Sequence, residues 1–424
     1  MQTSVMQRVG WLSHSKKNKI VADAWYIDKS MRIPDLMGIT SYYVASQKDS
    51  VIRGSIAYTR IFNSTKKVFE ASKLEAGVVG GREFQRYTNF ISSANEYSVF
   101  SEVTSTSLQN RISFDNYFSD RSFHYLAELR YTNVRVDNSN YKNNQYVEPF
   151  LAVNSIVDWN IIPTTFSAKA FYYQEWRSTY QSVPSFGASV TTQVGRRRNV
   201  TIEISGAHKF RIPDFNERFW AQGGNPNLKS ERGWMGHVFA DYFILKSKKN
   251  TLDVSARYSI MDMQQMIQWI PLDVWTAVNF ANVRLQTIEC IAHYTRAWNR
   301  LQWMSDFRIS SNFNQTTLLY TPQTSLFAST DFVYRKWDMG WQARWVGSRY
   351  FETGFDNPRS LDPYAVHDVF LGWKNSIDHP LFSIRIFVEN IFDTRYEMVR
   401  AYALPGRVFG VQLNFNPLNI RKSK

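Results

Sequence analysis

The residues of this 424-residue chain that could carry acid–base or nucleophilic chemistry do not fall into a catalytic pattern. Its seven histidines are dispersed, and none forms the H-E-x-x-H spacing of a zinc hydrolase. Neither a G-x-S-x-G nucleophile elbow nor a Walker phosphate loop occurs. His367 and Asp368 are neighbours on a predicted strand, so their side chains point to opposite faces and cannot act as a pair. We therefore predict that the chain is not an enzyme and has no cofactor.

Residues suited to binding metal or phosphate are equally sparse. Cys290 is the only cysteine, which excludes an intrachain disulfide and a cysteine-based metal site. The run Val78–Gly81 is rich in glycine, but no helical pattern follows it, so we interpret it as a bulge or turn. The sequence thus predicts no metal site.

The positive charge of the chain is spread over its length. The formal net charge is +14, and lysines and arginines occur in turns and strands throughout. Charge is concentrated at residues 196–198 and 421–424, which we interpret as a solvated turn and a solvated tail. No nucleic-acid partner is expected.

Alternation of apolar and polar residues predicts the elements that position the side chains. Between residues 252 and 260, for example, the apolar residues fall on even positions and the polar ones between them. A period of two is that of a strand with one apolar face, and no sustained period of 3.6 occurs, so helices should be rare. We predict strands at 20–27, 51–62, 68–79, 85–94, 96–106, 121–134, 146–158, 164–174, 200–205, 252–260, 301–309, 339–345, 382–388 and 409–415.

Short and long connections between the strands alternate. Short turns are expected near 159–163, 195–199, 247–250, 298–300, 336–338 and 376–380. Longer segments are expected at 134–146, 175–184, 210–231, 263–280, 312–323, 349–363 and 391–406. Outer-membrane barrels show this asymmetry, with short periplasmic turns and long extracellular loops. We predict an all-β fold, a transmembrane antiparallel up-and-down β-barrel with roughly 18 to 20 strands.

The composition is compatible with this fold. Phe, Trp and Tyr make up 16% of residues, mean hydropathy is −0.38, and no run of 18 apolar residues occurs. A helical membrane span is thereby excluded, whereas a polar lumen, a thin apolar band and two aromatic belts account for the totals. A large soluble β-protein has a similar composition, so the pattern of connections decides between them.

The alternation also predicts which side chains face lipid. A charge on the lipid face at mid-depth costs about 2–4 kcal/mol, so Arg308, Arg385 and Gln412 should face the lumen. The outward apolar band should include Trp303, Phe307, Trp341, Trp345, Phe409, Val411 and Leu413.

The segment between residues 210 and 231 has the most distinctive pattern in the chain. Its prolines and glycines prevent continuous strand pairing, and its interleaved aromatic and charged residues predict a packed loop. It resembles a signature of TonB-dependent outer-membrane receptors, although Ser230 stands where that family usually has proline. The matching residues are Phe210, Arg211, Pro213, Asn216, Glu217, Trp220, Gly223, Gly224, Asn225, Pro226, Leu228, Lys229 and Glu231.

A second motif near the C-terminus is similar to the closing pattern of the same family. Its residues are Asn390, Phe392, Tyr396, Pro405, Gly406, Arg407 and Phe409. The segments 24–26, 32–34 and 269–271 look like vitamin B12 (cobalamin) receptor-type members from Bacteroidetes-like bacteria. We expect both sets of motif residues to have structural roles.

The resemblance implies a barrel of about 22 strands in the Gram-negative outer membrane, with a lumen plugged by an N-terminal domain. It implies uptake of a large nutrient such as cobalamin or a ferric siderophore, with the TonB system acting through the plug. No plug, TonB box or signal peptide precedes the first predicted strand at about residue 20. We therefore expect residues 1–18 to be a poorly defined start, 19–416 the receptor barrel and 417–424 a basic tail. On this expectation the chain is the barrel portion of a receptor and does not by itself perform energy-coupled uptake.

Three residues of the segment 263–280 are candidate ligand contacts. Trp269, Trp275 and Asn279 supply the aromatic and polar groups that suit such nutrients. The alternative is that these aromatic residues belong to an interface belt. Two other functions stay open: a diffusion porin or adhesin-like barrel, and a soluble carbohydrate-binding β-protein.

Overall fold

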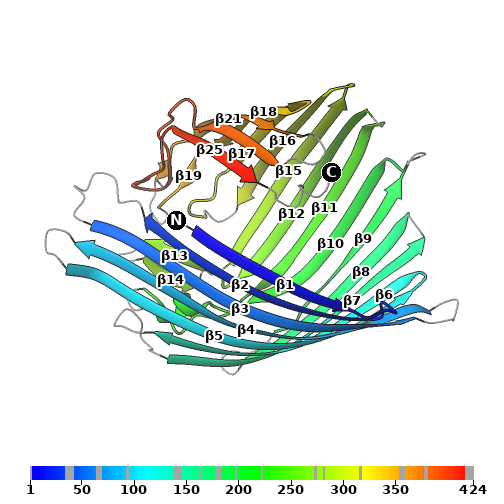
Figure 1. Ribbon diagram of the computed structural model, residues 1–424. Helices are drawn as coiled ribbons and strands as arrows, with labels where there is room; N and C mark the ends of the chain where they lie inside the picture. The colour runs from blue at the N-terminus through cyan, green and yellow to red at the C-terminus, as the bar shows by residue number, and fades with distance from the viewer. Residues whose placement is uncertain are drawn as a thin grey trace. The chain divides into compact units, whose positions relative to one another are not determined.

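The computed structural model describes residues 2–33, 43–63, 69–91, 96–136, 145–162, 165–177, 183–195, 198–220, 223–247, 249–271, 275–279, 282–314, 318–352, 359–376 and 381–415. These residues form 25 strands and one short helix, α1 (Phe215–Phe219), so the all-β prediction is confirmed (Figure 1). Among the residues described, no helix is long and apolar enough to cross a membrane.

Nineteen of the strands form one sheet. They are β1 (Gln2–Leu12), β2 (Asn18–Ile33), β3 (Tyr43–Asn63), β4 (Phe69–Ile91), β5 (Glu96–Phe118), β6 (Arg121–Val136), β7 (Gln145–Ile162), β8 (Phe166–Arg177), β9 (Ser185–Val194), β10 (Val200–Arg211), β11 (Glu231–Lys246), β12 (Asn250–Gln264), β15 (Asn282–Ala297), β16 (Leu301–Asn314), β17 (Thr324–Tyr334), β18 (Trp337–Val346), β21 (Tyr364–Lys374), β22 (Phe382–Glu389) and β25 (Val408–Phe415). The other six form three hairpins within long connections: β13 (Ile267–Pro271) with β14 (Trp275–Asn279), β19 (Arg349–Tyr350) with β20 (Ser360–Leu361), and β23 (Glu397–Val399) with β24 (Tyr402–Ala403).

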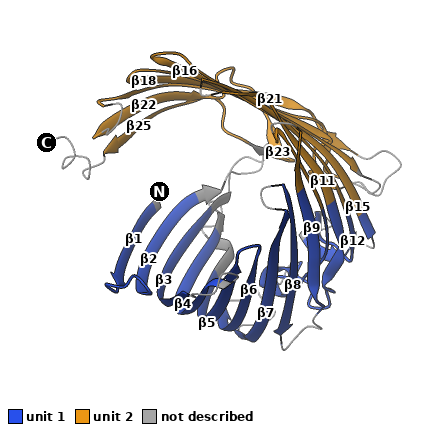
Figure 2. Ribbon diagram, turned by 90° about the vertical axis from the view of Figure 1, so that its right-hand side faces the viewer, with its two compact units in different colours: residues 1–191, 205–236, 261–283 blue, residues 192–204, 237–260, 284–424 orange. Residues whose placement is uncertain are grey.

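The chain divides into two compact units (Figure 2). Unit 1 comprises residues 1–191, 205–236 and 261–283, and unit 2 comprises 192–204, 237–260 and 284–424. In unit 1, β1 to β8 pair antiparallel in sequence order. In unit 2, β15, β16, β17, β18, β21, β22 and β25 do the same. This is the predicted up-and-down topology.

Each unit has one apolar and one polar sheet face. In unit 2, Met339, Leu371, Ile386 and Val411 lie in one row across four strands, and each is about half exposed or more. The next row, on the opposite face, contains Asp338, Gly372, Arg385 and Gln412.

The predicted register agrees with this pairing. Trp303, Phe307, Trp341, Trp345, Phe409, Val411 and Leu413 share the apolar face, and Arg308, Arg385 and Gln412 share the other. On the polar face, the Arg385 guanidinium forms an ion pair of 2.8 Å with Asp338. Its Cζ also lies 4.1 Å from the ring centroid of Phe370. The apolar face thus has the composition that lipid requires.

Three strands of unit 1 are much longer than a membrane crossing needs. β3 has 21 residues, and β4 and β5 have 23 each, whereas about 9–11 tilted residues cross a bilayer. The prediction of two strands at 68–79 and 85–94, with a turn or bulge at Val78–Gly81, is wrong, because one strand, β4, covers Phe69–Ile91. β4 continues through the glycines, with Gly80 opposite Gly54 and Gly81 opposite Arg53. A Cβ on Gly81 would lie 2.8 Å from Arg53 Cγ, so the glycine makes room for a cross-strand side chain.

Residues 2–12 form β1, although the start of the chain was expected to be poorly defined. The strand pairs with β2 from Gln2 opposite Lys29 to Leu12 opposite Lys19. Its alternation is broken by the adjacent apolar residues Val5 and Met6, which explains why the sequence pattern missed it.

Short and long connections alternate along most of the sheet, with one exception: residues 92–95, which join β4 to β5, are fewer than residues 64–68, which join β3 to β4. Residues 298–300 join β15 to β16 and residues 335–336 join β17 to β18, whereas 212–230 separate β10 from β11. Arg196, Arg197 and the C-terminal tail lie outside the described residues.

We predict that the long and short connections face opposite sides of the membrane. A cysteine at exposed Asn227, in the 212–230 segment, should react with a membrane-impermeant maleimide on intact cells, because long loops are extracellular. A cysteine at exposed Lys249, in a short turn, should react only after the outer membrane is permeabilised. Both variants carry Cys290→Ala, and labelling of the Lys249 position alone on intact cells would show inverted topology.

Candidate functional site

The segment between β10 and β11 folds around Arg211. Its guanidinium donates to Glu217 through Nη1 and Nη2, both at 3.0 Å, and to Glu231 through Nε at 2.7 Å and Nη2 at 2.9 Å. Both carboxylates are buried, with residue exposures of 8% and 7%. Bidentate pairing suits the planar guanidinium and ties the two ends of the connection together.

The two glutamates also hold backbone. Glu217 accepts a hydrogen bond of 2.6 Å from the N–H of Asp214, which precedes α1, and Glu231 accepts one of 2.5 Å from the N–H of Ile267. Arg211 therefore indirectly fixes both the start of α1 and the hairpin β13–β14.

The helix α1 packs on the polar face of unit 1. Phe215, Phe219 and Trp220 lie against buried Val134 and Val136 of β6. The ring of Tyr146 on β7 contacts those of Phe215 and Phe219. Arg218 is only 3% exposed, and its guanidinium lies 4.6 Å from the Tyr146 ring centroid. Sequence reasoning did not single out Arg218, because its burial depends on a tyrosine distant in the chain.

The glycine and asparagine motif forms a tight turn after the helix. Gly224 donates to the carbonyl of Trp220 at 2.6 Å, and Asn225 donates to the carbonyl of Glu217 at 2.8 Å. A Cβ on Gly224 would lie 2.5 Å from backbone atoms of Trp220, so only glycine fits. The Asn225 side chain accepts from the N–H of Asn227 at 3.0 Å. Leu228 then enters a buried cluster with Ile267 and Ala277.

The three candidate ligand residues lie in the hairpin β13–β14 of unit 1. Trp269 is opposite Ala277 and packs against the Leu228 cluster. Asn279 donates to the carbonyls of Lys229 and Gln265 and accepts from the Lys229 N–H at 2.8 Å. Its amide therefore holds the loop together, and a ligand contact stays a prediction. The side chain of Trp275 lies outside the described residues.

The C-terminal motif folds a second long connection, residues 390–407 of unit 2, through hydrogen bonds of its own. Asn390 is 2% exposed and has φ +50°, and its amide exchanges two hydrogen bonds of 2.9 Å with the backbone of Thr394. Its own N–H donates to Asp368 at 2.8 Å. Asp393, with φ +55°, accepts from the N–H of Arg407 at 2.8 Å. These contacts explain why asparagine and aspartate stand here, since both tolerate the left-handed backbone.

Arg349 also holds this connection in place, and the sequence did not single it out. It is 3% exposed and donates to the backbone carbonyls of Gly347, Asp362 and Glu397, which belong to two long connections. It also lies 4.9 Å from the ring of Tyr364, which contacts Tyr396 at 4.4 Å. Burial raises the pKa of the Tyr396 hydroxyl, so this residue stays neutral in the packed loop.

The remaining motif residues divide by burial. Pro213 and Gly223 are buried, and Phe210 is partly buried on β10. Asn216, Pro226, Lys229, Pro405 and Arg407 are exposed, as are Phe392 and Phe409, at 68% and 72%. Among the residues described, no cluster of three or more His, Cys, Asp or Glu side chains could hold a metal ion. The described motif residues organise the long connections of the chain.

Comparison with known proteins gives a family match over most of the chain. Residues 16–391 match the family model described as "TonB dependent receptor-like, beta-barrel". A vitamin B12 transporter of Photobacterium profundum is 24% identical over 237 residues, covering 53% of this chain and 37% of the relative. That of Vibrio vulnificus is 22% identical over 215 residues, covering 49% and 33%. The matches thus span only about a third of the length of these relatives.

Solved structures share the fold. The copper transporter OprC superposes with a TM-score of 0.75 at 15% identity, covering 98% of this chain and 71% of that one. The FrpB iron transporter from Neisseria meningitidis (F5-1 variant) gives a TM-score of 0.71 at 14% identity, covering 98% and 72%.

We predict that Arg211→Met destabilises the protein by about 3 kcal/mol, because it leaves two buried carboxylates without their cation. This is the lower end of the range for breaking a buried pair, since the Arg211 side chain is 39% exposed. Urea unfolding in detergent, followed by tryptophan fluorescence, measures the loss. The matched control is Arg232→Met on β11, where the arginine is exposed. Equal losses in the two variants would contradict the role of Arg211.

A second prediction concerns the left-handed backbone at Asn390. Asn390→Gly should cost about 2 kcal/mol through two lost side-chain hydrogen bonds. Asn390→Ala should cost about 1 kcal/mol more, because alanine resists a positive φ. The same unfolding assay applies, with exposed Arg395→Ala as the neutral control. Identical stabilities of the glycine and alanine variants would show that the backbone conformation imposes no constraint.

Proposed function

The chain belongs to the TonB-dependent receptor-like β-barrel family, and from this premise we propose that it forms the wall of an outer-membrane receptor for energy-coupled uptake of a large, scarce nutrient. The family match over residues 16–391 carries the proposal. The contacts around Arg211 and around Asn390 support it. Each set falls on one of the receptor motifs recognised in the sequence and keeps a long connection folded. The family is one of receptors, not enzymes, as the sequence led us to expect.

We propose a corrinoid of the vitamin B12 type as the first cargo to test. Two relatives at 24% and 22% identity are vitamin B12 transporters. Structural neighbours at lower identity include copper and iron transporters and a ferric-catecholate receptor, so a ferric siderophore is the next candidate. The aromatic ring of Trp269 offers a flat apolar contact for either class.

Energy coupling separates this proposal from a diffusion porin. A porin passes solute in proportion to its concentration, whereas a receptor saturates and depends on the TonB system. The packed helix α1 and the buried Arg218 favour a receptor, since they build an ordered structure on the polar face, where a simple pore needs none.

The proposal is tested by uptake of radiolabelled cyanocobalamin into a Gram-negative host that lacks its own vitamin B12 receptor and expresses the natural gene. Accumulation should saturate and should disappear when TonB is deleted. Trp269→Ala should raise the half-saturation concentration several-fold, whereas Trp298→Ala, at a short turn, should not change it. Linear, TonB-independent entry would favour the porin. Saturable uptake of a ferric siderophore alone would replace the cargo and keep the function.

A further inference from the structure

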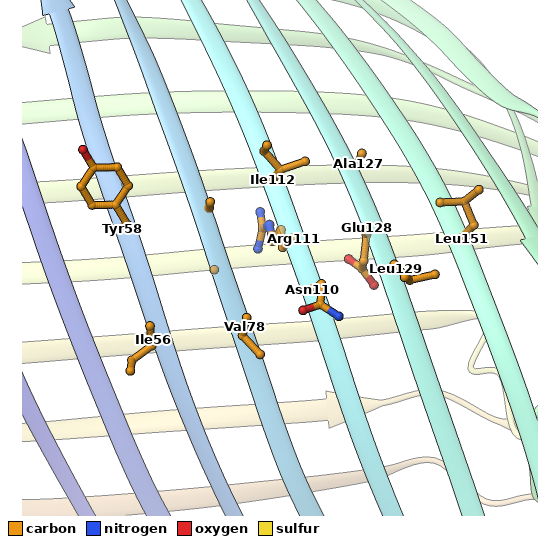
Figure 3. A pocket seen from close by; sticks show the side chains of 12 residues that line it. Ile56, Tyr58, Val78, Asn110, Arg111, Ile112, Ala127, Glu128, Leu129 and Leu151 are labelled. Atoms are coloured by element: carbon orange, nitrogen blue, oxygen red, sulfur yellow. The ribbon is translucent and has the colours of Figure 1, made fainter.

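The apolar face of unit 1 contains a groove. A hollow of about 390 Å³ is lined by residues of β3 to β7, among them Ile56, Val78 and Leu129 (Figure 3). A second hollow of about 380 Å³ adjoins it, and Ile112 and Ala127 border both. The side chains around the groove are unusually exposed, with Ile56 at 59% and Leu129 at 54%. The groove is therefore an apolar surface with room for a chain-like apolar group.

Asn110 places one polar group in this apolar surface. It stands opposite Val78 on one side and Leu129 on the other, and its side chain is exposed. The side chain has no hydrogen-bond partner among the residues that the structure describes. An unpaired amide facing hydrocarbon is unfavourable, so the position calls for a polar group from outside the chain. An ester or amide linkage of a lipid supplies one.

Two arginines lie farther along the same face. Arg82 is four residues beyond Val78 on β4, about 13 Å along the strand, and Arg135 is six residues beyond Leu129 on β6. Both are exposed, and in the described part of the chain neither has an ion pair or a hydrogen-bond partner. Neighbouring charges on this face are paired, as Arg86 is with Glu102. The two arginines are therefore available to an external anion.

The arginines flank the same short stretch of β5. Arg82 is opposite Thr106, and Arg135 is opposite Thr104. Arg82 on β4 and Arg135 on β6 are separated by two interstrand spacings, and their partners on β5 are two residues apart. Their Cα atoms are therefore roughly 12 Å apart, so that both side chains can reach one phosphorylated headgroup. Both lie toward the end of the sheet at which residues 34–42 join β2 to β3 and residues 137–144 join β6 to β7, the side predicted to be extracellular.

We propose that this face binds one phosphorylated glycolipid of the outer leaflet, with an acyl chain in the groove, its linkage at Asn110 and its phosphate between Arg82 and Arg135. The order of groups fits such a lipid, because half the hydrocarbon thickness of a bilayer is about 15 Å. Charge complementarity selects an anionic headgroup. The inference rests on the proposed outer-membrane location and does not depend on the cargo.

The test measures lipid binding to the purified, delipidated protein in detergent by native mass spectrometry, with diphosphorylated lipid A as the probe. The wild-type chain should retain one lipid A at low micromolar concentration. The double variant Arg82→Gln/Arg135→Gln should bind at least tenfold more weakly. Gly80→Ile should also weaken binding, because it fills the path between groove and arginines. A Cβ there meets no atom closer than Leu108 Cδ1 at 4.0 Å, so the variant should fold.

The matched control is Arg60→Gln, an exposed arginine at the opposite end of the same sheet face, and it should bind normally. Unchanged binding in the double variant or in Gly80→Ile would overturn the site. Equal retention of phosphatidylglycerol by the wild-type chain would overturn the glycolipid assignment. Because this assay needs no transport, lost uptake with intact lipid binding would count against the proposed function alone, and the reverse result would count against the lipid site alone.

Discussion

Backbone pairing along long antiparallel strands is the constraint on which the rest of this structure depends. A strand in lipid has no water to satisfy its N–H and C=O groups, so each must find a partner on a neighbouring strand. The paired registers show this along β2 to β5, interrupted only by register shifts near the two ends of the β4–β5 pair. Once pairing is fixed, the pleat forces side chains alternately to two faces, and the sequence alternates accordingly.

The long connections meet a different requirement, since they lack continuous strand partners. In each unit an arginine holds the long connections in place through several hydrogen bonds. Arg211 joins two buried carboxylates, and Arg349 joins backbone carbonyls from separate connections. A guanidinium suits this role because its five donors lie in one plane and stay charged at all physiological pH values. The loops are therefore held by polar contacts, while the hydrophobic clusters beneath them are small.

Periodicity was sufficient to predict the sheet but not its interruptions. The alternation around Ile384 and Arg385 gave the correct register, because one side of that sheet is apolar and the other charged. The same reasoning failed at Gly80 and Gly81, since glycine is common in turns yet here accommodates the Arg53 side chain across the strand. Motif residues such as Arg211 and Asn390 could be named from sequence. Arg218 and Arg349 could not, because their burial depends on partners brought close only by folding.

The 23-residue strands β4 and β5 have a consequence for the dynamics of the wall. At about 3.3 Å per residue such a strand is roughly 76 Å long, and a tilt of about 45° lets it rise roughly 54 Å. In the proposed outer-membrane location the hydrocarbon core is only about 30 Å thick, so nearly half of each strand lies outside it, in the headgroup regions and in water. There the same ladder of hydrogen bonds competes with solvent, whereas inside the bilayer it has no competitor. Amide hydrogen exchange along a single strand should therefore change from slow to fast where the strand leaves the hydrocarbon core. One continuous strand would then be rigid inside the bilayer and locally mobile outside it.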